Sequence, residues 1–358
     1  MKAWLPILGQ TQGRILFLDG FAGPGEYRGG EQGSPVIALN AFREHSARKM
    51  ITAEVRFVFI EKHEDRARHL ERLLQPLALE LPPRSVEVVR GAFDETLAKE
   101  LDALTDAGLT LAPCFAMVDP LGVSDTPMEV IARILAHPKS EIYISVMYEH
   151  INRFRGSSEF SDPLDSLYGC DDWRAYVDLD DGRERRRSLF ELYKRQLRQA
   201  GAEHVVHFDL YDRGQHRYSI FHASRHPRAS NEMKAAIWSV DPGGGFAFHG
   251  GQTEQLALGV EPNFRPLQDA LRREFRGDRW VTIEEVEAFV MSDKTDYHRS
   301  QLRTHALIPM EHRGDLHVKR SEREGREAQG TLPGLFDRER APHRKRPTYP
   351  AGTELRIS

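Results

Sequence analysis

The sequence has few cysteines and no long apolar segment. These two absences argue against a disulfide-stabilised protein and against a membrane-spanning one. Only Cys114 and Cys170 occur among 358 residues, and they form no C-x-x-C pair. Two isolated thiols indicate buried cysteines in a reducing cytosol, with no disulfide framework. No apolar run reaches the roughly 18 residues of a membrane helix, and the N-terminus lacks the longer apolar region of a signal peptide. We therefore expect a cytoplasmic protein that does not enter a membrane.

The sequence also lacks a strong excess of charge of one sign. Its net charge is −4, with 40% hydrophobic and 29% charged residues, which predicts a folded core. No GK[ST] sequence of a phosphate-binding P-loop occurs, and we predict no metal site. Positive charge is nevertheless concentrated locally, because residues 183–198 hold seven Lys or Arg against two Glu. Such a local basic face is able to bind phosphate on a chain of nearly neutral charge.

Apolar runs alternate with helical patterns over the first 240 residues. Buried strands are predicted at residues 15–18, 55–60, 86–89, 114–118 and 142–147. Helix starts are predicted at Ser34-Pro35 and at a capping box that begins at Thr126. Strands separated by helices predict a parallel sheet covered on both faces. Residues 204–210 and 218–224 resemble a hairpin, so the expected fold is α/β, a Rossmann-like class I methyltransferase sheet.

Two departures from this alternation predict the domain organisation. Residues 155–200 are polar and charged, and we expect them to form a helical insertion after the fifth strand. Residues 241–251 are rich in glycine and indicate a loop or linker. We place the first domain at residues 1–260 and the second at 264–358.

The second domain is predicted to be a winged helix-turn-helix. Leu267, Leu271 and Phe275 share one helical face, and Thr282 with Glu285 begins a second helix. A third helix over 296–310 is followed by strands at 312–319 and 353–357. Three helices followed by two strands are typical of this domain.

The most informative segment is the apolar strand that breaks into a glycine-rich loop at residues 14–25. Ligands of open α/β sheets bind at the carboxyl ends of strands beside such turns. S-adenosylmethionine (SAM) requires a glycine-rich first loop, an acid after the second strand for the ribose, and a polar residue after the third for adenine. The chain offers Gly20–Gly25, Glu61 and Asp94 at these places. NAD is disfavoured because the loop lacks the third glycine of G-x-G-x-x-G.

Asp119 and Pro120 end the fourth strand at the same expected edge. Amino-methyltransferases carry Asp-Pro-Pro-aromatic or Asn-Pro-Pro-aromatic there, where the Asp and the Pro carbonyl accept hydrogen bonds from the target amine. This chain continues with Leu121-Gly122 and therefore lacks the stacking ring. Phe93 or Tyr148 is a candidate for that ring. The alternative is that Asp119-Pro120 only terminates a strand.

Several of these segments resemble one protein family. DGFAGPG at 19–25, GSP at 33–35, FIE at 59–61, VDPLG at 118–122, TPME at 126–129 and INRF at 151–154 resemble the three-Cys-motif partner protein family (TcmP). The resemblance implies a class I SAM-dependent methyltransferase fold, a joined winged helix and a partner protein with a three-cysteine motif. The expected cofactor-binding residues are Asp19, Gly20, Phe21, Ala22, Gly23, Gly25, Ser34, Glu61 and Asp94.

The same loop is also similar to that of ribosomal RNA adenine-N6 methyltransferases. Their L-D-x-x-A-G-x-G-x-Y and P-G-S-P sequences compare with LDGFAGPGEY and QGSP here. That similarity implies that Asp19, Gly23, Gly25 and Ser34 line the SAM pocket.

We predict contacts with DNA or RNA on both domains. Arg153 follows the fifth strand, with pairing to Glu149 as its alternative. Tyr297, Arg299 and Arg303 lie where a recognition helix is expected, and Arg344, Lys345 and Arg346 lie in the wing. Winged helices also mediate protein contacts. We therefore predict a SAM-dependent methyltransferase acting on nucleic acid, or a non-catalytic module that binds SAM, nucleic acid or the three-Cys-motif partner.

Overall fold

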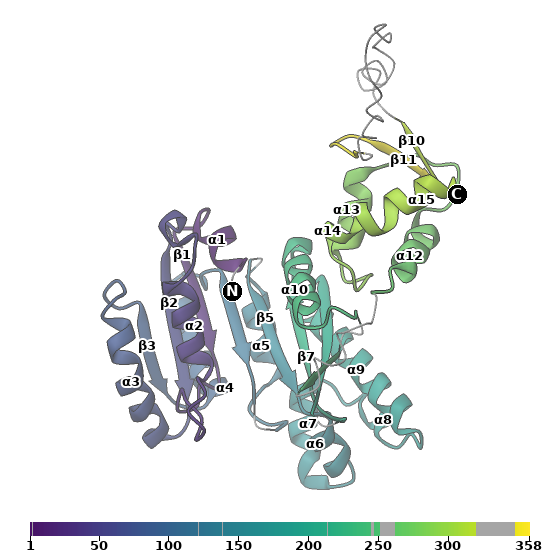
Figure 1. Cartoon of the computed structure of the whole chain (residues 1–358). Helices are drawn as coiled ribbons and strands as arrows, with labels where there is room; N and C mark the ends of the chain where they lie inside the picture. Colours follow the sequence, from purple (N-terminus) through teal and green to yellow (C-terminus); the bar gives the residue numbers. More distant parts are fainter. Residues whose placement is uncertain are drawn as a thin grey trace, which may run out of the picture. The chain divides into compact units, whose positions relative to one another are not determined.

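The chain divides into two compact units (Figure 1). The computed structural model describes residues 1, 3–120, 122–137, 139–212, 214–244, 247–250, 262–319 and 348–358. Among these positions the first unit holds Met1–Asp241 and a short strand, β8 (Ala247–Gly250), and the second holds Pro242–Gly244, 262–319 and 348–358. No helix in the described ranges is long and apolar enough to cross a membrane.

The first unit is built on one mixed sheet with the order β3-β2-β1-β4-β5-β7-β6-β8. Its strands are β1 (Arg14–Asp19), β2 (Glu54–Glu61), β3 (Val86–Arg90), β4 (Cys114–Val118), β5 (Glu141–Val146), β6 (His204–Asp212), β7 (Gln215–Ser224) and β8 (Ala247–Gly250). The first five pair in parallel, whereas β7 runs antiparallel between β5 and β6. This order confirms the predicted class I methyltransferase-like sheet and its terminal hairpin.

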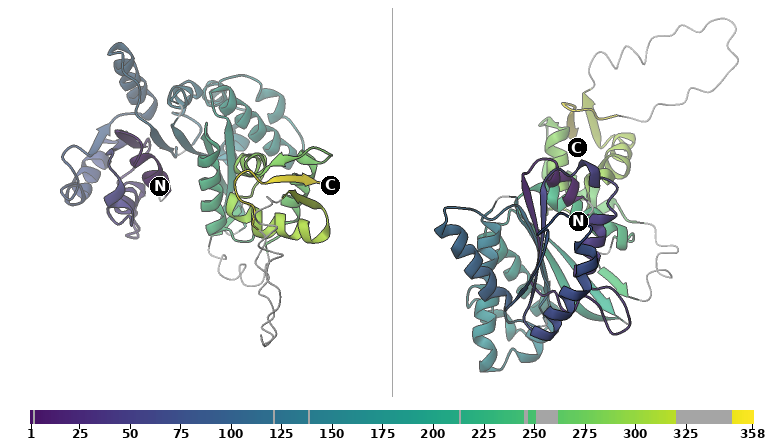
Figure 2. Two further views of the ribbon diagram at one scale, coloured as in Figure 1. Left: turned by 90° about the horizontal axis from the view of Figure 1, so that it is seen from above. Right: turned by 90° about the vertical axis from the view of Figure 1, so that its left-hand side faces the viewer.

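Helices cover both faces of this sheet (Figure 2). One face carries α1 (Trp4–Gly9), α2 (Ser34–Arg43), α3 (Glu64–Ala78) and α10 (Pro227–Val240). The other face carries α4 (Phe93–Asp106), α5 (Met128–Leu135), α7 (Ser161–Tyr168) and α9 (Gly182–Gln199). Together with α6 (Tyr148–Phe154) and α8 (Arg174–Val177), α7 and α9 form the predicted helical insertion between β5 and β6.

The strands lack polar alternation because both of their faces are buried. On the face of α1 to α3, Phe17, Phe57, Phe59 and Phe115 pack against one another, with ring centroids 5.8 to 6.5 Å apart. Buried aromatic pairs of this kind add about 0.5–1.5 kcal/mol each beyond their area. The core therefore holds the central strands rigidly and fixes the positions of the residues that follow them.

Three local predictions are corrected by the structure. Gly33, not Ser34, is the N-cap of α2, because the Ser34 hydroxyl is hydrogen-bonded to Asp19 instead. Pro127 is the N-cap of α5, so Thr126 forms no capping box. The glycine-rich segment predicted as a loop contains β8, whose backbone pairs in parallel with β6. A sheet edge can be extended through backbone groups alone, which gives no side-chain pattern to detect.

The second unit combines short helices with a three-stranded sheet of order β10-β11-β9. Its elements are α12 (Arg265–Phe275), β9 (Val281–Thr282), α13 (Ile283–Met291), α14 (Arg299–Gln301), a π-helical turn η3 (Leu302–Leu307), α15 (Ile308–Arg313), β10 (Leu316–Lys319) and β11 (Glu354–Ile357). The predicted apolar face of α12 is buried, and the capping box of Thr282 with Glu285 is present. The predicted third helix is divided among α14, η3 and α15.

Candidate cofactor and acceptor site

Three carboxylates lie on one face of the sheet at the carboxyl ends of adjacent strands. Asp19 ends β1, Glu61 ends β2, and Asp119 directly follows β4. Asp19 is in register with Phe59 of β2 and with Met117 of β4, so Glu61 and Asp119 each lie two residues further along. Side chains two residues apart on a strand share a face. We refer to Asp19, Glu61 and Asp119 as the carboxylate cluster.

Asp19 is the fully buried member of this cluster. Its carboxylate accepts a hydrogen bond from the Ser34 hydroxyl at 2.6 Å and another from the Phe21 backbone N–H at 3.2 Å. Burial raises the pKa of Asp19 to about 6, although these two donors oppose it, and the charges of Asp119 and Glu61 raise it further. The three carboxylates therefore disfavour one another's charge, and a bound cation would relieve this repulsion.

The glycine-rich loop needs glycine for different reasons at different positions. A Cβ on Gly20 would lie 2.4 Å from the Phe93 ring, so only glycine permits that close packing. Gly23 and Gly25 have φ values of +63° and +83°, which disfavour other residues. A Cβ on Gly25 would meet the Leu70 side chain at 2.6 Å, whereas a Cβ on Gly23 would meet nothing within 4 Å. Of the three, only Gly23 borders open space.

Backbone hydrogen bonds fix this loop against the sheet. The Gly33 N–H donates to the Gly25 carbonyl at 2.7 Å, and the Ala22 N–H donates to the Ile60 carbonyl at 2.9 Å. Ala22 is buried, and the Phe21 ring is tilted against the Phe93 ring with centroids 5.4 Å apart. The predicted loop residues are thus brought together beside the end of β2.

Glu61 and Asp94 provide two acceptors at the ends of the neighbouring strands β2 and β3. Glu61 is only 6% exposed, and its Oε1 accepts a hydrogen bond from the His63 N–H at 2.8 Å. Asp94 lies in the first turn of α4, and its buried Oδ1 has no hydrogen-bond partner in the described chain. An unsatisfied buried acceptor costs about 1–3 kcal/mol, so a ligand donor at this atom would be stabilising. Acceptors at these two places fit the ribose and the amino group of an adenosyl ligand.

Asp119 is the exposed member of the cluster, and Pro120 beside it is buried. Partial burial raises the pKa of the Asp119 carboxyl, and the neighbouring Ser145 hydroxyl of β5 opposes that shift. Gly122, with φ +146°, lies next to His150 of α6. Asp119 is thus the group of the cluster best placed to meet a second ligand from solvent.

Neither ring proposed from the sequence lies beside Asp119 as an available stacking surface. Phe93 is 1% exposed and packs against Phe21. Tyr148 is 5% exposed, and its hydroxyl donates to the Gly182 carbonyl at 3.2 Å. Both predictions are therefore wrong, because packing in the core uses these rings.

The sequence analysis missed Ser145 and Tyr218, which the sheet brings to the Asp119 edge. Their positions depend on the pairing of β7 with β5, across which Ser145 is in register with Ile220. Tyr218 is half-buried two residues from Ile220 on β7. The predicted hairpin was the available signal, but an antiparallel register cannot be read from the strand sequences alone.

The predicted nucleic-acid residues lie in different environments. Arg153 is exposed at the end of α6, and within the described chain no ion pair joins it to Glu149. Arg299 pairs with Glu287 of α13 at 2.9 Å, while Arg303 is exposed on η3. Arg344, Lys345 and Arg346 lie outside the described residues.

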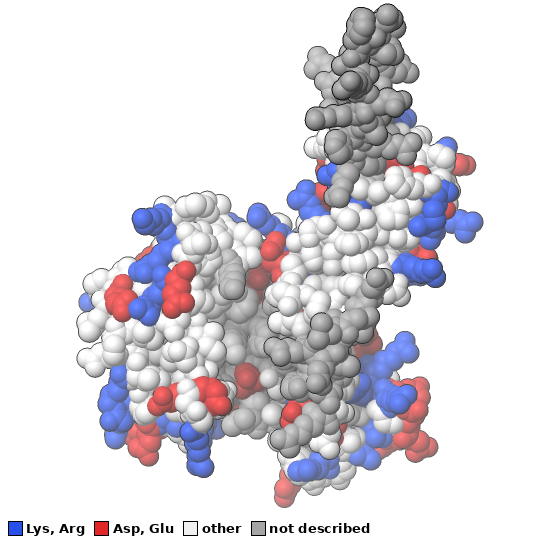
Figure 3. Space-filling model, viewed as in Figure 1, with Lys and Arg blue, Asp and Glu red and all other residues white. Residues whose placement is uncertain are grey.

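Tyr297 is corrected from a surface contact to a packing residue. It is 8% exposed, its hydroxyl donates to the Asn263 carbonyl at 2.7 Å, and its ring lies against Phe264. On the face seen in Figure 3, Lys and Arg side chains are interspersed with Asp and Glu. Arg195 of the basic helix α9, for example, pairs with Asp172 at 2.5 Å. The local charge excess of α9 is therefore partly compensated.

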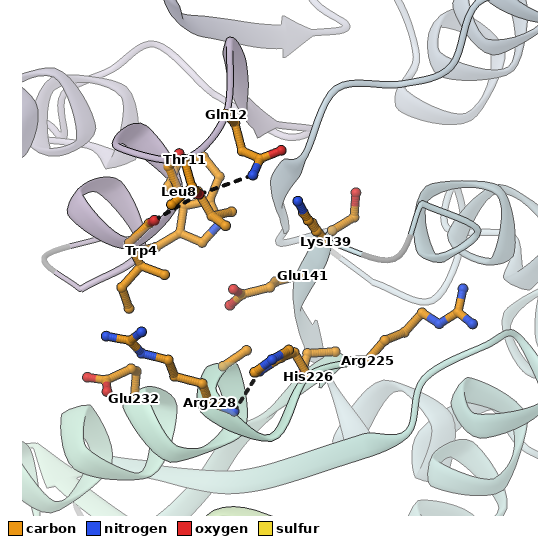
Figure 4. Close-up of a pocket in the computed structure, with 14 residues that line it drawn as sticks. Trp4, Leu8, Thr11, Gln12, Lys139, Glu141, Arg225, His226, Arg228 and Glu232 are labelled. Atoms are coloured by element: carbon orange, nitrogen blue, oxygen red, sulfur yellow. Dashed lines mark hydrogen bonds between the residues drawn. The ribbon is translucent and has the colours of Figure 1, made fainter. Parts of the chain in front are cut away.

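A separate cavity of about 400 Å³ lies at the amino edge of the sheet. Trp4 of α1 and Arg228 of α10 lie on opposite sides of it, with Glu141 at the start of β5 between them (Figure 4). Glu141 and Val146 are the two ends of β5, about 16 Å apart at roughly 3.3 Å per residue. A small ligand in this cavity would therefore not reach the carboxylate cluster.

Comparisons with known proteins return distant structures only. No family model matches the chain, and no curated protein matches it. A Bacillus cereus O-methyltransferase in complex with SAH is 14% identical, with 62% of this chain and 80% of that one covered at a TM-score of 0.34. A Geobacter metallireducens precorrin-6y C5,15-methyltransferase is 12% identical, with 63% and 87% covered at 0.30. The METTL16 MTase domain is 14% identical, with 63% and 66% covered at 0.31.

With TM-scores below 0.5, these likenesses carry no weight for function, and the fold class rests on the strand order itself. The resemblance to TcmP stays a prediction. Among the described residues, no group of three or more His, Cys, Asp or Glu side chains is placed to hold a metal ion.

Proposed function

We propose that this protein is a SAM-dependent methyltransferase that acts on nucleic acid. The observation that carries the proposal is the carboxylate cluster, in which Asp19, Glu61 and Asp119 share one face at the carboxyl edge of the sheet. The cofactor supplies a methyl group activated by an adjacent positive sulfur. A negatively charged edge of the sheet suits such a cation, and negative groups clustered without one are costly.

Three of the predicted cofactor residues are assigned direct roles in this proposal. Glu61 would accept hydrogen bonds from the two ribose hydroxyls, and Asp94 Oδ1 would accept one from the adenine amino group. The open space at Gly23 would admit the amino-acid end of the ligand. Hydrogen bonds to charged acceptors contribute roughly 1.5–3 kcal/mol each, so Glu61 is expected to contribute strongly to affinity.

Asp119 and Pro120 would orient the acceptor. The Asp119 carboxylate and the Pro120 carbonyl are expected to accept hydrogen bonds from the target amine and direct its lone pair at the methyl group. Correct positioning of two reactants is able to contribute about 7–11 kcal/mol to a reaction of this kind. Asp119 acts here as an orienting acceptor, and its exposure lets a substrate reach it.

Delivery of the nucleic acid is assigned to the second unit. Its element order supports a winged helix-turn-helix: α12, β9, α13, a third helical segment divided among α14, η3 and α15, and then β10 and β11, with β11 central in the sheet. Exposed Arg303 lies on η3, where a recognition helix would lie, and contacts of Arg with phosphate would make binding sensitive to salt. The resemblance to TcmP adds a three-Cys-motif protein as a proposed partner.

One observation favours a second candidate, a non-catalytic module that binds SAM. The chain has Leu121-Gly122 where amino-methyltransferases have Pro and an aromatic residue, and Phe93 and Tyr148 are both buried. Such a module would bind SAM, nucleic acid or the partner without methyl transfer.

Calorimetry with SAM and a transfer assay with labelled methyl groups on DNA, RNA and the partner separate the two candidates. Binding that is lost in Glu61→Gln, together with label on a nucleic acid, supports the methyltransferase. Binding without transfer to any acceptor supports the module. The absence of SAM binding by the wild-type chain would refute both.

A further inference from the structure

We infer that Tyr218 of β7 forms the stacking wall of the acceptor subsite beside Asp119, and that the acceptor is therefore a planar base carrying an exocyclic amine. This inference rests on the proposed function, which leaves the acceptor unassigned. The ring that other amino-methyltransferases place directly after Asp-Pro would here come from a different strand, about 100 residues later in the sequence.

Sheet register brings Tyr218 to the correct edge and face. Val118 of β4 is in register with Ile144 of β5, so Asp119 continues opposite Ser145. Ser145 in turn is in register with Ile220 of β7, and Tyr218 lies two residues beyond it toward the same edge. Asp119, Ser145, Ile220 and Tyr218 therefore follow one another across one face of three neighbouring strands.

A β-bulge lies directly beside Tyr218 and separates it from His216. The pairing shifts between Leu210, opposite Tyr218, and Tyr211, opposite His216, so Arg217 is the extra residue. His216 consequently faces the side of α9, where it contacts Phe190, while Tyr218 packs toward Ile220 on the other face. Bulges re-aim side chains and are frequent beside active sites.

On the face of the hairpin opposite Tyr218, hydrogen bonds to Asp209 of β6 hold the residues around the bulge. Asp209 Oδ1 accepts from His207 Nε2 at 2.9 Å and from the Ser219 hydroxyl at 2.5 Å, and His216 Nε2 lies 3.3 Å from the same oxygen. Ser219 follows Tyr218 directly in the chain. These bonds hold the backbone on both sides of Tyr218 and therefore preorganise its ring.

Electrostatic neighbours place the Tyr218 hydroxyl near Asp119 and the glycine-rich loop. Burial raises the pKa of Tyr218, and the charge of Asp119 and the hydroxyl of Tyr27 add to the increase. Tyr27 lies in the loop between β1 and α2 and is 68% exposed. The half-buried Tyr218 is thus within electrostatic range of both the orienting carboxylate and the exposed Tyr27.

This combination of groups favours a base over an aliphatic amine. A flat acceptor would stack on Tyr218 while its exocyclic N–H groups reach Asp119 and the Pro120 carbonyl. An aliphatic ammonium would gain little from stacking and would arrive protonated, without a lone pair. Aromatic side chains stack on every base with little sequence preference, which suits an acceptor unpaired from its strand.

The test uses the full-length protein and a single-stranded DNA oligonucleotide with one 2-aminopurine, whose fluorescence is quenched by stacking. We expect the wild-type chain with SAM to quench it, and Tyr218→Ala to lose the quenching and bind about tenfold or more weakly. Tyr218→Phe keeps the ring and should retain both properties. Tyr211→Ala, across the same bulge on the opposite face, is the matched control and should also retain them.

Thermal unfolding shows whether each variant is folded, and SAM calorimetry is expected to be unchanged in all three. Equal quenching by Tyr218→Ala and wild type would overturn the inference, as would quenching lost equally in Tyr211→Ala. A wild-type chain that binds SAM without quenching the probe would overturn the base-stacking assignment alone. A wild-type chain that fails to bind SAM would instead refute the proposed function, so the two failures are distinguishable.

Discussion

The Ser34 hydroxyl at the start of α2 donates a 2.6 Å hydrogen bond to the buried Asp19 carboxylate at the end of β1. This bond joins the two ends of the glycine-rich loop, 15 residues apart in the chain. It also opposes the rise in the pKa of Asp19 that burial causes. Ser34 therefore both holds the two ends of the loop together and lowers the pKa of Asp19.

Replacing Ser34 should affect stability and the titration of Asp19 together. We expect Ser34→Ala to lower the free energy of unfolding by about 1–3 kcal/mol, because it leaves a buried acceptor without its donor. The pKa of Asp19 should rise above its present value of about 6. Chemical denaturation at several pH values measures both effects. Ser34→Thr keeps the hydroxyl, and an equal loss in that variant would count against the hydrogen bond.

The stability of the protein without ligands should fall as pH rises through about 6. The pKa of Asp19 is higher in the folded chain than the usual value of about 3.9, so folding favours its protonated form. Its contribution is fully present below about pH 4 and is lost as pH increases through about 6. Asp19→Asn should flatten this part of the curve of melting temperature against pH. An unchanged slope in the variant would assign the effect to another group.

Asp119→Ala should strongly reduce methyl transfer while leaving SAM binding intact. Alanine removes the oxygen that would accept a hydrogen bond from the acceptor amine, so we expect turnover to fall by about 100-fold or more, the size of a lost stabilising group. Initial rates and calorimetry measure the two properties separately. Asp125→Ala is the matched control, because Asp125 lies in the same loop and pairs with Lys62 at 3.4 Å. Preserved turnover in Asp119→Ala would remove Asp119 from the reaction.

Two glycines of the loop should respond differently to alanine. Both Gly23 and Gly25 have positive φ, so each substitution should cost about 1–2 kcal/mol of backbone strain. Gly25→Ala should cost about 1–3 kcal/mol more, because its Cβ would meet the side chain of Leu70 at 2.6 Å. Gly23→Ala should weaken SAM binding, because its Cβ would enter the space proposed for the ligand. Equal melting temperatures for the two variants would contradict the packing argument.

Asp209 should stabilise the hairpin at neutral pH and lose this effect in acid. Burial opposes its ionisation, but hydrogen bonds from His207 and His216 outweigh burial and hold the pKa of Asp209 well below its ordinary range. Its contribution is therefore present above about pH 4 and declines as pH falls further. We expect Asp209→Asn to cost about 1–3 kcal/mol at pH 7 and less in acid.

Asp212→Asn is the control for this effect on the same hairpin. Asp212 forms an exposed ion pair with Arg217 at 2.9 Å, and exposed pairs contribute only about 0–1 kcal/mol. Denaturation of both variants at pH 7 and pH 4 compares them. A larger loss in Asp212→Asn would show that the buried hydrogen bonds are not what holds the bulge.

The positions of the acids at the strand ends could be predicted because they depend on neighbours in the chain, whereas their binding of a cofactor stays a prediction. Asp19 and Glu61 each follow an apolar run, and parallel strands separated by helices bring their carboxyl ends to one edge. Strand and helix types followed from apolar periodicity and from the glycine-rich turn. The helix caps at Ser34 and Thr126 were wrong because sequence does not show whether a hydroxyl caps a helix. The Ser34 hydroxyl is bonded to Asp19 instead, and the buried Thr126 hydroxyl has no hydrogen-bond partner among the described residues.

The amino-acid sequence by itself determined the parallel sheet, the hairpin and the acids at the strand ends, because these depend on periodicity and on neighbours in the chain. Only the tertiary structure decided which rings are buried and which reach the acceptor edge. Phe93 and Tyr148 are buried in the core, whereas the antiparallel register of β7 against β5 brings Tyr218 to the same edge and face of the sheet as Asp119. Register is set by cross-strand packing over long sequence separations, and no local pattern records it.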